Sequence, residues 1–538
     1  MTKTIVHFGM LLALLLLPAQ MKTQTTCYYI RFADKASTPY TLSKPSDYLS
    51  ARALERRAGQ NLPVDSTDIP VCQSYLDSLI HYGATIIHTS RWMNGATVTL
   101  DAAGSLNDIA ALPFVVSCQL TRDSLLSAPN GSTNKRQATA IAKSVTGNAS
   151  QHQIEMLGGT ALHNAGFRGK GMLIAIMDNG FFGVNTLAAF DSVREHIIDR
   201  YNYVTGNENI YDGGMHGTRV FSTIAANVPG SYLGSAPDAE YLLYVSEDEA
   251  SESLRECDNW IAAAERADSI GADIISTSLG YVSFDDISTS FPYSALDGQT
   301  ARMSRAATIA ARKGMIVLIA AGNNGASSHP YISVPADADS ILTVGSVNAA
   351  GVYSPFSSIG TTFDNRLKPT LCAQGEGTAL VDEWGNILYG NGTSFATPIL
   401  AGVVASLWGA VPEWSNWQLI VQLIQSASLY TAPNNRMGYG IPNVEPILTD
   451  ILSGSISTGI PASTPYSIYL SGHDSMLHIV GNRHQTFDIT ILDLRGHIKL
   501  SRRASRQLDI NISSLPKGVY LVKTVDSMGI TIQKIIKQ

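Results

Sequence analysis

Between residues 150 and 451 the chain alternates short apolar runs with longer stretches that place apolar residues at helical spacing. The first pattern predicts buried strands and the second predicts amphipathic helices. The predicted strands are 172–177, 239–245, 274–278, 316–320 and 341–344, and the predicted helices are 252–269, 294–312, 394–409 and 414–426. This alternation predicts an α/β fold in which helices cover both faces of a parallel sheet.

The patterns on either side of this region predict two further domains, joined to it by linkers. Residues 25–127 hold strand-like segments at 27–32, 84–89, 96–100 and 114–119 and helical segments at 46–58 and 70–82, which predict a small α+β domain. Residues 466–538 hold short strand-like segments separated by turn signals, which predict a small β-sandwich. Residues 128–149 and 452–465 are polar or rich in small residues, as expected of linkers.

Residues 1–24 have the pattern of a secretory signal peptide. Lys3 supplies positive charge, an apolar run follows at 10–18, and polar residues begin at Gln20. The run is shorter than the roughly 20 residues that cross a bilayer, so a signal is favoured over the alternative of a membrane anchor. No later stretch reaches that length without charge or Gly. We therefore expect a secreted or surface protein with no transmembrane anchor.

Composition narrows the function classes. A chain of 538 residues is too long for a single hydrophobic core, so several domains are expected. Its content of 45% hydrophobic and 15% charged residues is typical of folded proteins. A net charge of −7 argues against a nucleic-acid partner. The spacing of the five cysteines matches no metal site. A disulfide among Cys27, Cys72 and Cys118 is possible in an exported protein, and we do not expect one between Cys257 and Cys372.

Three short motifs carry residues suited to nucleophilic catalysis. Asp178 ends an apolar run, His216 stands among glycines, and Ser394 begins a predicted helix. A serine hydroxyl is a weak nucleophile until a base removes its proton, and imidazole suits that task near neutral pH. Alone, Ser394 could be a helix cap, His216 a structural histidine and Asp178 the first residue of a turn. Together they predict a catalytic acid, base and nucleophile.

The chain resembles the subtilisin-type (subtilase) serine endopeptidases over about residues 150–447. The motifs are Asp178-Asn179-Gly180, His216-Gly217-Thr218, Ala320-Ala321-Gly322-Asn323 and Gly392-Thr393-Ser394. The order Asp, His, Ser is the one known for that family. The resemblance implies that Asn323 donates to the oxyanion, with Asn324 as the competing candidate.

The resemblance also implies where substrate binds. Ser278, Leu279 and Gly280 match the segment that pairs with an extended peptide. Ala320, Ala321 and Gly322 match a wall of the primary specificity pocket, whose small side chains favour an apolar substrate residue. The chemistry requires no cofactor. Structural calcium is common in the family, but the sequence has no EF-hand-like run of carboxylates, so we predict no metal ligands.

Four positions depart from the family pattern. Asn179 stands where Thr or Ser is common, Met215 replaces Gly, Arg219 replaces His, and Phe395 replaces Met. We expect these changes to affect local hydrogen bonding, rate and substrate shape while leaving the triad in place.

Both flanking domains carry resemblances to proteins of Bacteroidetes. Residues 28–58 resemble the region before subtilases of these bacteria, which implies a propeptide that assists folding and blocks the cleft; a permanent structural domain is the alternative. Cleavage in the exposed linker 128–149 would remove a propeptide. Residues 515–522 and 534–537 resemble a type A C-terminal sorting domain, which implies bacterial secretion machinery as a partner; a carbohydrate- or protein-binding domain is the alternative.

The sequence thus predicts a secreted serine endopeptidase, made as a zymogen, that acts on proteins or peptides through an acyl-enzyme. One alternative is a catalytically degenerate surface protein that serves in adhesion. A second is an esterase of the α/β-hydrolase class. That class requires Gly-x-Ser-x-Gly and the order Ser, acid, His, and neither is present.

Overall fold

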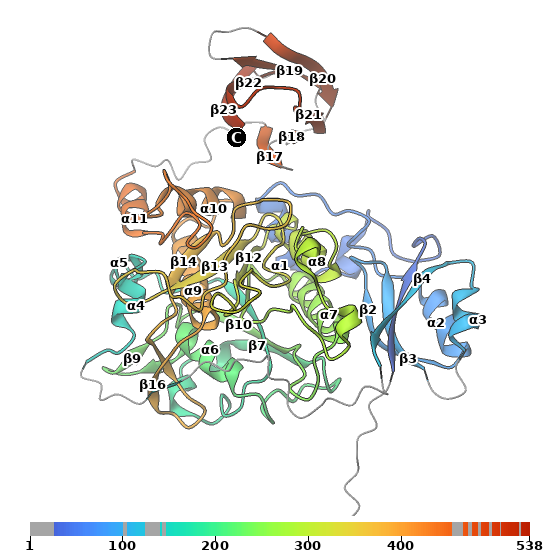
Figure 1. The fold of residues 1–538 in the computed structure, drawn as a ribbon, viewed down its shortest axis with the longest axis horizontal. Helices are drawn as coiled ribbons and strands as arrows, with labels where there is room; N and C mark the ends of the chain where they lie inside the picture. The colour runs from blue at the N-terminus through green and yellow to red at the C-terminus, as the bar shows by residue number, and fades with distance from the viewer. Residues whose placement is uncertain are drawn as a thin grey trace, which may run out of the picture.

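The computed structural model describes most of the chain (Figure 1). The described residues are 26–100, 105–123, 140–141, 147–454, 466–471, 476–481, 486–493, 498–505, 507–526 and 529–537. The predicted signal peptide lies outside them, as does most of each predicted linker. The domain boundaries therefore stay predictions.

A seven-stranded parallel sheet forms the centre of the molecule, as the alternating pattern predicted. Its strand order is β14-β13-β12-β11-β6-β10-β7. The strands are β6 (Leu173–Asp178), β7 (Ile197–Asn202), β10 (Glu240–Val245), β11 (Ile274–Thr277), β12 (Ile316–Ala320), β13 (Leu342–Val347) and β14 (Leu371–Gln374). The chain fills one side of β6 with β7 and β10, and then crosses to the other side at β11. The carboxyl end of β6 is therefore a topological switch point, where α/β sheets bind ligands.

Helices on the two faces of this sheet produce two separate cores. Helices α6 (His216–Ala225) and α9 (Thr393–Ala410) pack on one face, and α7 (Leu254–Ile270) and α8 (Arg302–Arg312) pack on the other. Strand β6 contributes side chains to both cores: Ile174 and Ile176 pack in the first core, and Ala175 and Met177 pack in the second. Because side chains alternate across a strand, only an all-apolar strand satisfies both faces.

Three element predictions needed correction. The helix predicted at 294–312 begins at Arg302, because the Asp297 carboxylate accepts from the backbone N–H of Gln299 and Thr300 and holds a turn there. The edge strands β7 and β14 were missed, and β7 is only half-buried, so its apolar pattern is weak. The residues after His216 also predict a helix, over 220–227, and in the structure that helix begins earlier, at His216.

The chain continues past α9 with two more helices on the same side of the sheet. These are α10 (Asn416–Gln425) and α11 (Glu445–Leu452), and the second was not predicted. Among the described residues, α9 is the one helix long and apolar enough to cross a membrane, and 89% of that stretch is buried inside the fold. Its apolar character is that of a core helix.

The N-terminal domain is the predicted α+β unit. Its antiparallel sheet has the order β2-β3-β1-β4, with β1 (Cys27–Phe32), β2 (Ala84–Ser90), β3 (Gly95–Leu100) and β4 (Val115–Arg122). Helices α2 (Gln73–His81) and α3 (Leu106–Ala110) cover one face and enclose a small core. The other side of the domain lies against α7, where His88 Nε2 is 2.8 Å from Asn259 Oδ1 (Figure 1). None of the five cysteines forms a disulfide.

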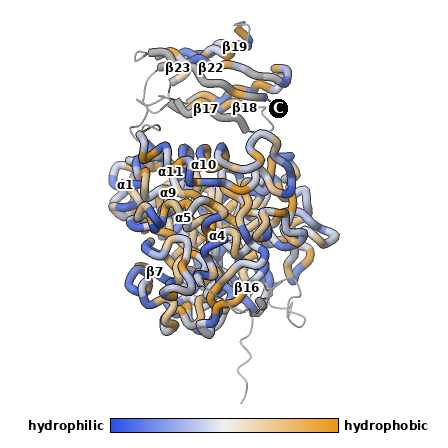
Figure 2. Tube along the Cα trace, turned by 90° about the vertical axis from the view of Figure 1, so that its left-hand side faces the viewer, coloured by the Kyte–Doolittle hydropathy of each residue, from blue (hydrophilic) through white to orange (hydrophobic). Residues whose placement is uncertain are grey.

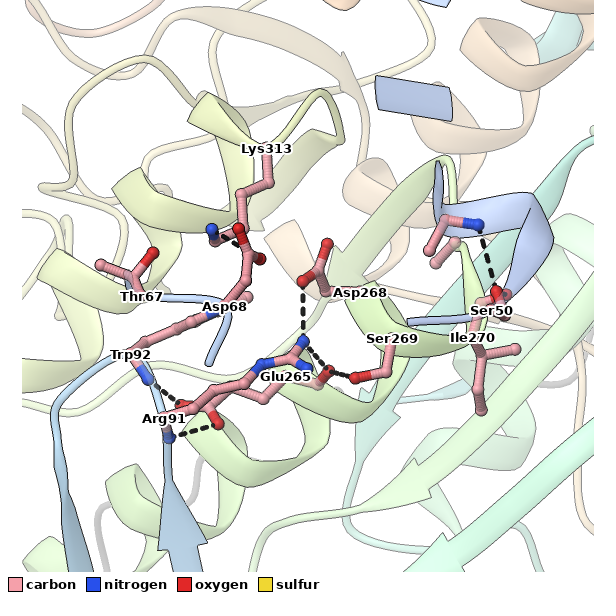
Figure 3. A network of polar contacts seen from close by, with 12 residues as sticks. Ser50, Thr67, Asp68, Arg91, Trp92, Glu265, Asp268, Ser269, Ile270 and Lys313 are labelled. Atoms are coloured by element: carbon pink, nitrogen blue, oxygen red, sulfur yellow. Dashed lines mark hydrogen bonds and ion pairs between the residues drawn. The ribbon is translucent and has the colours of Figure 1, made fainter. Parts of the chain in front are cut away.

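A buried ion network fastens this domain to α7 and α8 (Figure 3). Arg56 and Arg57, on α1 (Ala51–Gly59), and Arg91, after β2, all donate to the carboxylate of Asp268 on α7. Lys313, just after α8, pairs with Asp68 at 2.8 Å. The Glu265 carboxylate accepts from Ser90 and from the backbone N–H of Arg91 and Trp92. Each buried charge thus has a partner from the opposite domain.

The C-terminal region forms two antiparallel sheets, as the β-sandwich prediction required. Figure 2 shows one layer with β17 and β18 and another with β19, β22 and β23. The sheets have the orders β17-β18-β21 and β20-β19-β22-β23. Their strands are β17 (Tyr466–Ser471), β18 (Met476–Gly481), β19 (Thr486–Asp493), β20 (Ile498–Ser505), β21 (Gln507–Asn511), β22 (Gly518–Asp526) and β23 (Gly529–Lys537). Lys537 donates to the carbonyls of Ile512 and Ser513, at 2.7 and 2.9 Å, which anchors the last strand.

Candidate active site

The acid and the base of the predicted triad are in direct contact. Asp178 is the last residue of β6 and is fully buried, and His216 is the first residue of α6. His216 Nδ1 lies 2.7 Å from Asp178 Oδ1. Gly217 allows this approach, because a Cβ there would lie 2.2 Å from the carbonyl oxygen of Gly180. The start of α6 therefore rests against the turn that follows β6.

Asn179 rebuilds the hydrogen bonds around the acid. Its backbone N–H donates to Asp178 Oδ1 at 2.9 Å, its Oδ1 accepts from Gly217 N at 3.2 Å, and its Nδ2 donates to Glu249 at 2.7 Å. Asp178 Oδ2 is buried and has no partner in the described part of the chain. The carboxylate is consequently oriented through Oδ1 alone.

The electrostatic surroundings of His216 favour its charged form. Burial acts to lower the pKa of the imidazole, but attraction to Asp178, the hydrogen bond to it, and the charge of Glu247 together outweigh that effect and raise the pKa above the usual value. Arg219 opposes the rise. An imidazole with these neighbours can hold a proton taken from a hydroxyl, as a general base must.

Ser394 lies at the start of the buried helix α9, directly beside the segment proposed to bind substrate. Its Oγ is 3.4 Å from the carbonyl oxygen of Ser278, and Ser278 Oγ donates to the carbonyl of Ser394 at 2.8 Å. The ring of the next residue, Phe395, lies 6.1 Å from the ring of His216, and α6 packs on α9. In this structure the hydrogen bond of Ser394 Oγ goes to the carbonyl of Ser278 and not to His216.

The amide oxygen of Asn323 holds this side chain against Thr393, the residue before Ser394. Oδ1 accepts from the backbone N–H of Thr393 at 2.9 Å and from its hydroxyl at 3.0 Å. This orientation leaves Nδ2 as the atom that can donate to a substrate. The competing candidate, Asn324, instead uses its backbone N–H to donate to Ser358. The contacts therefore favour Asn323 at the position next to Ser394.

The predicted substrate-binding residues lie at the same edge of the sheet. Ser278, Leu279 and Gly280 follow directly on β11, and Gly280 is exposed, so its backbone is open to a peptide. Ala320 ends β12 and is followed by Ala321, which is buried, and by the half-buried Gly322. All of these residues stand at the carboxyl ends of β11, which pairs with β6, and of β12, the next strand in the parallel sheet.

Two features of this region escaped the sequence analysis. Arg219, one turn after His216, forms a two-pronged ion pair with Glu383, at 2.8 and 2.7 Å. From the loop after β10 into the first turn of α7, residues 247–256 hold five carboxylates, and three of them gather within 4.8 Å of one another: Glu247, Glu252 and Glu256. The density of acidic residues in ten positions was the available signal.

The fold is that of an α/β protein in which Asp178, at the carboxyl end of a parallel strand, contacts His216, and Ser394 lies in the first turn of a helix packed on the same sheet. Comparison with known families specifies this further. The subtilase family profile matches residues 169–440, which is just over half of the chain. The chain belongs to the subtilase family of serine peptidases.

The flanking domains match families of their own. Residues 27–139 match the peptidase S8 propeptide domain of Bacteroidota, and residues 468–538 match the secretion system C-terminal sorting domain. The sorting domain places the protein outside the cell or at its surface. Both resemblances noted in the sequence are thereby confirmed.

Individual relatives have low sequence identity to this chain, but they align with it over more than half of its length. Subtilisin NAT from Bacillus subtilis subsp. natto is 28% identical over 380 residues, which cover 69% of this chain and 84% of the relative. Subtilisin from Bacillus pumilus is 31% identical over 301 residues, which cover 54% of this chain and 96% of the relative. A solved structure of MycP3 protease from the type VII (ESX-3) secretion system covers 60% of this chain and 96% of its own, with 20% identity and a TM-score of 0.44.

Proposed function

We propose that this subtilase is an active secreted endopeptidase, made as a zymogen, in which Asp178, His216 and Ser394 form the catalytic triad. The observation that carries the proposal is the 2.7 Å contact between the buried Asp178 and His216, whose helix α6 packs on α9, the helix that carries Ser394 in its first turn. A degenerate protein that served only in adhesion would have no need to maintain this buried contact.

The proposed reaction begins with attack by Ser394 Oγ on the carbonyl carbon of a peptide bond. His216 takes the hydroxyl proton, and Asp178 keeps the Nδ1–H donor in place and stabilises the imidazolium. Asn323 Nδ2 and the backbone N–H of Ser394 donate to the oxyanion. His216 then protonates the leaving amine, and water hydrolyses the acyl-enzyme by the same steps in reverse. None of the proposed reaction steps uses a cofactor.

The substrate is proposed to bind as an extended strand along Ser278, Leu279 and Gly280. The hydrogen bonds between Ser278 and Ser394 hold this segment beside the nucleophile. Ala320, Ala321 and Gly322 supply only small side chains to the adjoining wall, so the primary pocket is proposed to accept an apolar residue.

The decisive experiment compares the Ser394→Ala variant with the Ser406→Ala variant, which changes a serine on the same helix. We expect Ser394→Ala to lower kcat on casein or peptides by about 10⁶-fold and to abolish fluorophosphonate labelling. Ser406→Ala, whose hydroxyl bonds the Ser235 carbonyl, should retain both. Labelling that persists in the Ser394→Ala variant would identify a different nucleophile and refute the proposal.

A further inference from the structure

The propeptide domain is fastened to the peptidase domain at a place far from the proposed catalytic residues. Between β1 and α2 the chain forms an anchoring arm, residues 48–62, which contains α1. The arm contacts the loops after α7 and α8, and these loops lead into the amino ends of β11 and β12. Asp178 and Ser278, in contrast, stand at the carboxyl ends of β6 and β11. Because a six-residue strand such as β6 spans about 17 Å, the arm and the site lie at opposite ends of the sheet.

The anchoring arm supplies donors and positive charge to the end of α7. Ser50, which lies beside Ile270 in Figure 3, donates its hydroxyl to the Ile270 carbonyl at 2.8 Å. Arg52 donates to the Gly271 carbonyl at 3.1 Å and to the Asp273 carboxylate at 2.6 Å. The last carbonyls of a helix have no partner within it, and they give that end a partial negative charge. An arginine stabilises such an end, so the arm and this surface are complementary in charge.

The anchoring arm also packs closely against the loop after α8. Gln60 donates to the Gly314 carbonyl at 2.8 Å and accepts from the backbone N–H of Asn416 at 3.0 Å. A Cβ on Gly314 would lie 2.9 Å from Nε2 of Gln60, and a Cβ on Gly271 would lie 2.7 Å from the backbone nitrogen of Ala53. The two surfaces are therefore in close contact, with no room for a further side chain at either glycine.

Separation of the two domains would leave two carboxylates of α7 without hydrogen-bond partners. Asp268 is fully buried, and Glu265 is 7% exposed. Among the described residues, every hydrogen-bond donor to these two carboxylates belongs to the propeptide domain. Loss of the domain would remove all of those donors at once, and the loss of a buried counter-charge is strongly unfavourable. The interface therefore opposes dissociation even when the chain between the domains is broken.

The proposed catalytic groups, by contrast, take their partners from the peptidase domain. In the described part of the chain, the side chains of Asp178, His216, Ser394 and Asn323 hydrogen-bond only to residues of that domain. The predicted linker 128–149 is the covalent connection between the two domains. A cut in this linker breaks none of the contacts of the anchoring arm or of Asp268, because all of them come from propeptide residues before position 92.

We infer that the propeptide domain stays bound after the linker is cut and serves as a lasting non-covalent subunit of the active peptidase, held by the anchoring arm and the buried network of Asp268. Access of substrate to Ser394 and release of the domain are then two separate events. The first requires a cut in the linker, and the second requires loss of the arm contacts. Retention of the domain does not depend on the proposed function, whereas activity of the retained complex rests on it.

Retention is tested independently of catalysis. In the full-length Ser394→Ala protein, residues 131–136 are replaced by the recognition sequence of a site-specific protease, and the cut protein is analysed by size-exclusion chromatography and native mass spectrometry. We expect the two fragments to remain together in a 1:1 complex. Arg52→Ala combined with Gln60→Ala should raise their dissociation rate about 10- to 100-fold, because the arm loses its hydrogen bonds to both loops. The control Lys44→Ala, which removes a side chain that is 71% exposed, should leave the rate unchanged. Fragments of the parent protein that separate at once after the cut would overturn the inference.

Activity of the complex is tested on the wild-type protein after its own maturation. A fluorophosphonate probe should label Ser394 in complexes that still contain the propeptide domain, as native mass spectrometry of the same sample would show. Mature protein without the domain would overturn the inference, and so would labelling that begins only once mild urea has removed the domain. Absence of labelling both before and after that removal would overturn the proposed function instead, and the cut Ser394→Ala protein would still decide whether the domain is retained.

Discussion

Arg57 of the propeptide domain donates to both carboxylate oxygens of Asp268 in the peptidase domain, at 2.9 and 2.8 Å. Arg56 and Arg91 donate to the same carboxylate, at 2.5 and 2.8 Å, and Asp268 is fully buried. The two domains are therefore joined through a group with no access to water. Such a pair costs much to break, because each remaining charge stays buried without a counterion.

Asp268→Asn should weaken the zymogen strongly. In the uncleaved Ser394→Ala background, we expect the loss of charge to destabilise the docked state by about 3–5 kcal/mol, measured as a lower Tm or an earlier urea transition. Asp191→Asn is the control, because its carboxylate is 63% exposed in its pair with Arg194 and should contribute at most about 1 kcal/mol. Equal effects of the two substitutions would show that the buried network does not hold the domains together.

His88 should make the zymogen sensitive to mild acid. Burial lowers the pKa of this imidazole against α7, so the folded protein takes up its proton at lower pH than the unfolded chain, whose histidine has a pKa of about 6.5. The stability due to neutral His88 is thus complete above pH 6.5 and falls as the pH drops below it. The lowered pKa of Asp268 acts only in stronger acid, below the range of ordinary carboxylates.

The measurement is the Tm of the Ser394→Ala zymogen between pH 8 and pH 5.5. His88→Gln, which keeps an amide able to bond Asn259, should show a smaller decrease in Tm over this range than the parent. A pH dependence that is identical in both proteins would assign the acid sensitivity to other groups.

The raised pKa of His216 should set the acid limit of catalysis. A general base must be neutral, so kcat/KM should fall about tenfold per pH unit below this pKa, with the midpoint above the ordinary value of about 6.5. Because Arg219 lowers the pKa and Glu247 raises it, Arg219→Gln should move the acid limb to higher pH and Glu247→Gln to lower pH. Profiles on an uncharged peptide would check both directions; a shift of the same sign in the two variants would contradict the assignment.

Asn323→Ala should impair turnover more than binding. Loss of one oxyanion donor typically lowers kcat by about 10²–10³-fold, and KM should change little because the interaction strengthens only in the transition state. Thr393→Val separates this role from a structural one, since it removes the hydroxyl that bonds Asn323 Oδ1 and retains the backbone N–H bond. We expect the Thr393 variant to keep most activity. A larger loss there than at Asn323 would favour a purely structural role for the asparagine.

The pattern of apolar residues along the chain was sufficient to predict the central parallel sheet, because strands buried on both faces appear as short, almost entirely apolar runs. The run Leu173–Asp178 is apolar up to its last residue, since both faces are covered, and its end marks where Asp178 stands. The same reasoning found β12 and the helix that begins near Ser394. It failed for β7, which is half-buried at the sheet edge, and for the start of α8, where the Asp297 turn replaces helix.

The sequence alone determined the alternation of buried strands and helices, the family and which residues are proposed as acid, base, nucleophile and oxyanion donor. Only the tertiary structure decided that Asp178 contacts His216, that Asn323 faces Thr393, and that Ser394 Oγ rests on Ser278. The same holds for the pairing of Arg57 with Asp268, two residues separated by 211 positions. The physical reason is that periodicity along a chain records which side chains are buried, whereas the partner of a buried charge is set by how distant segments pack.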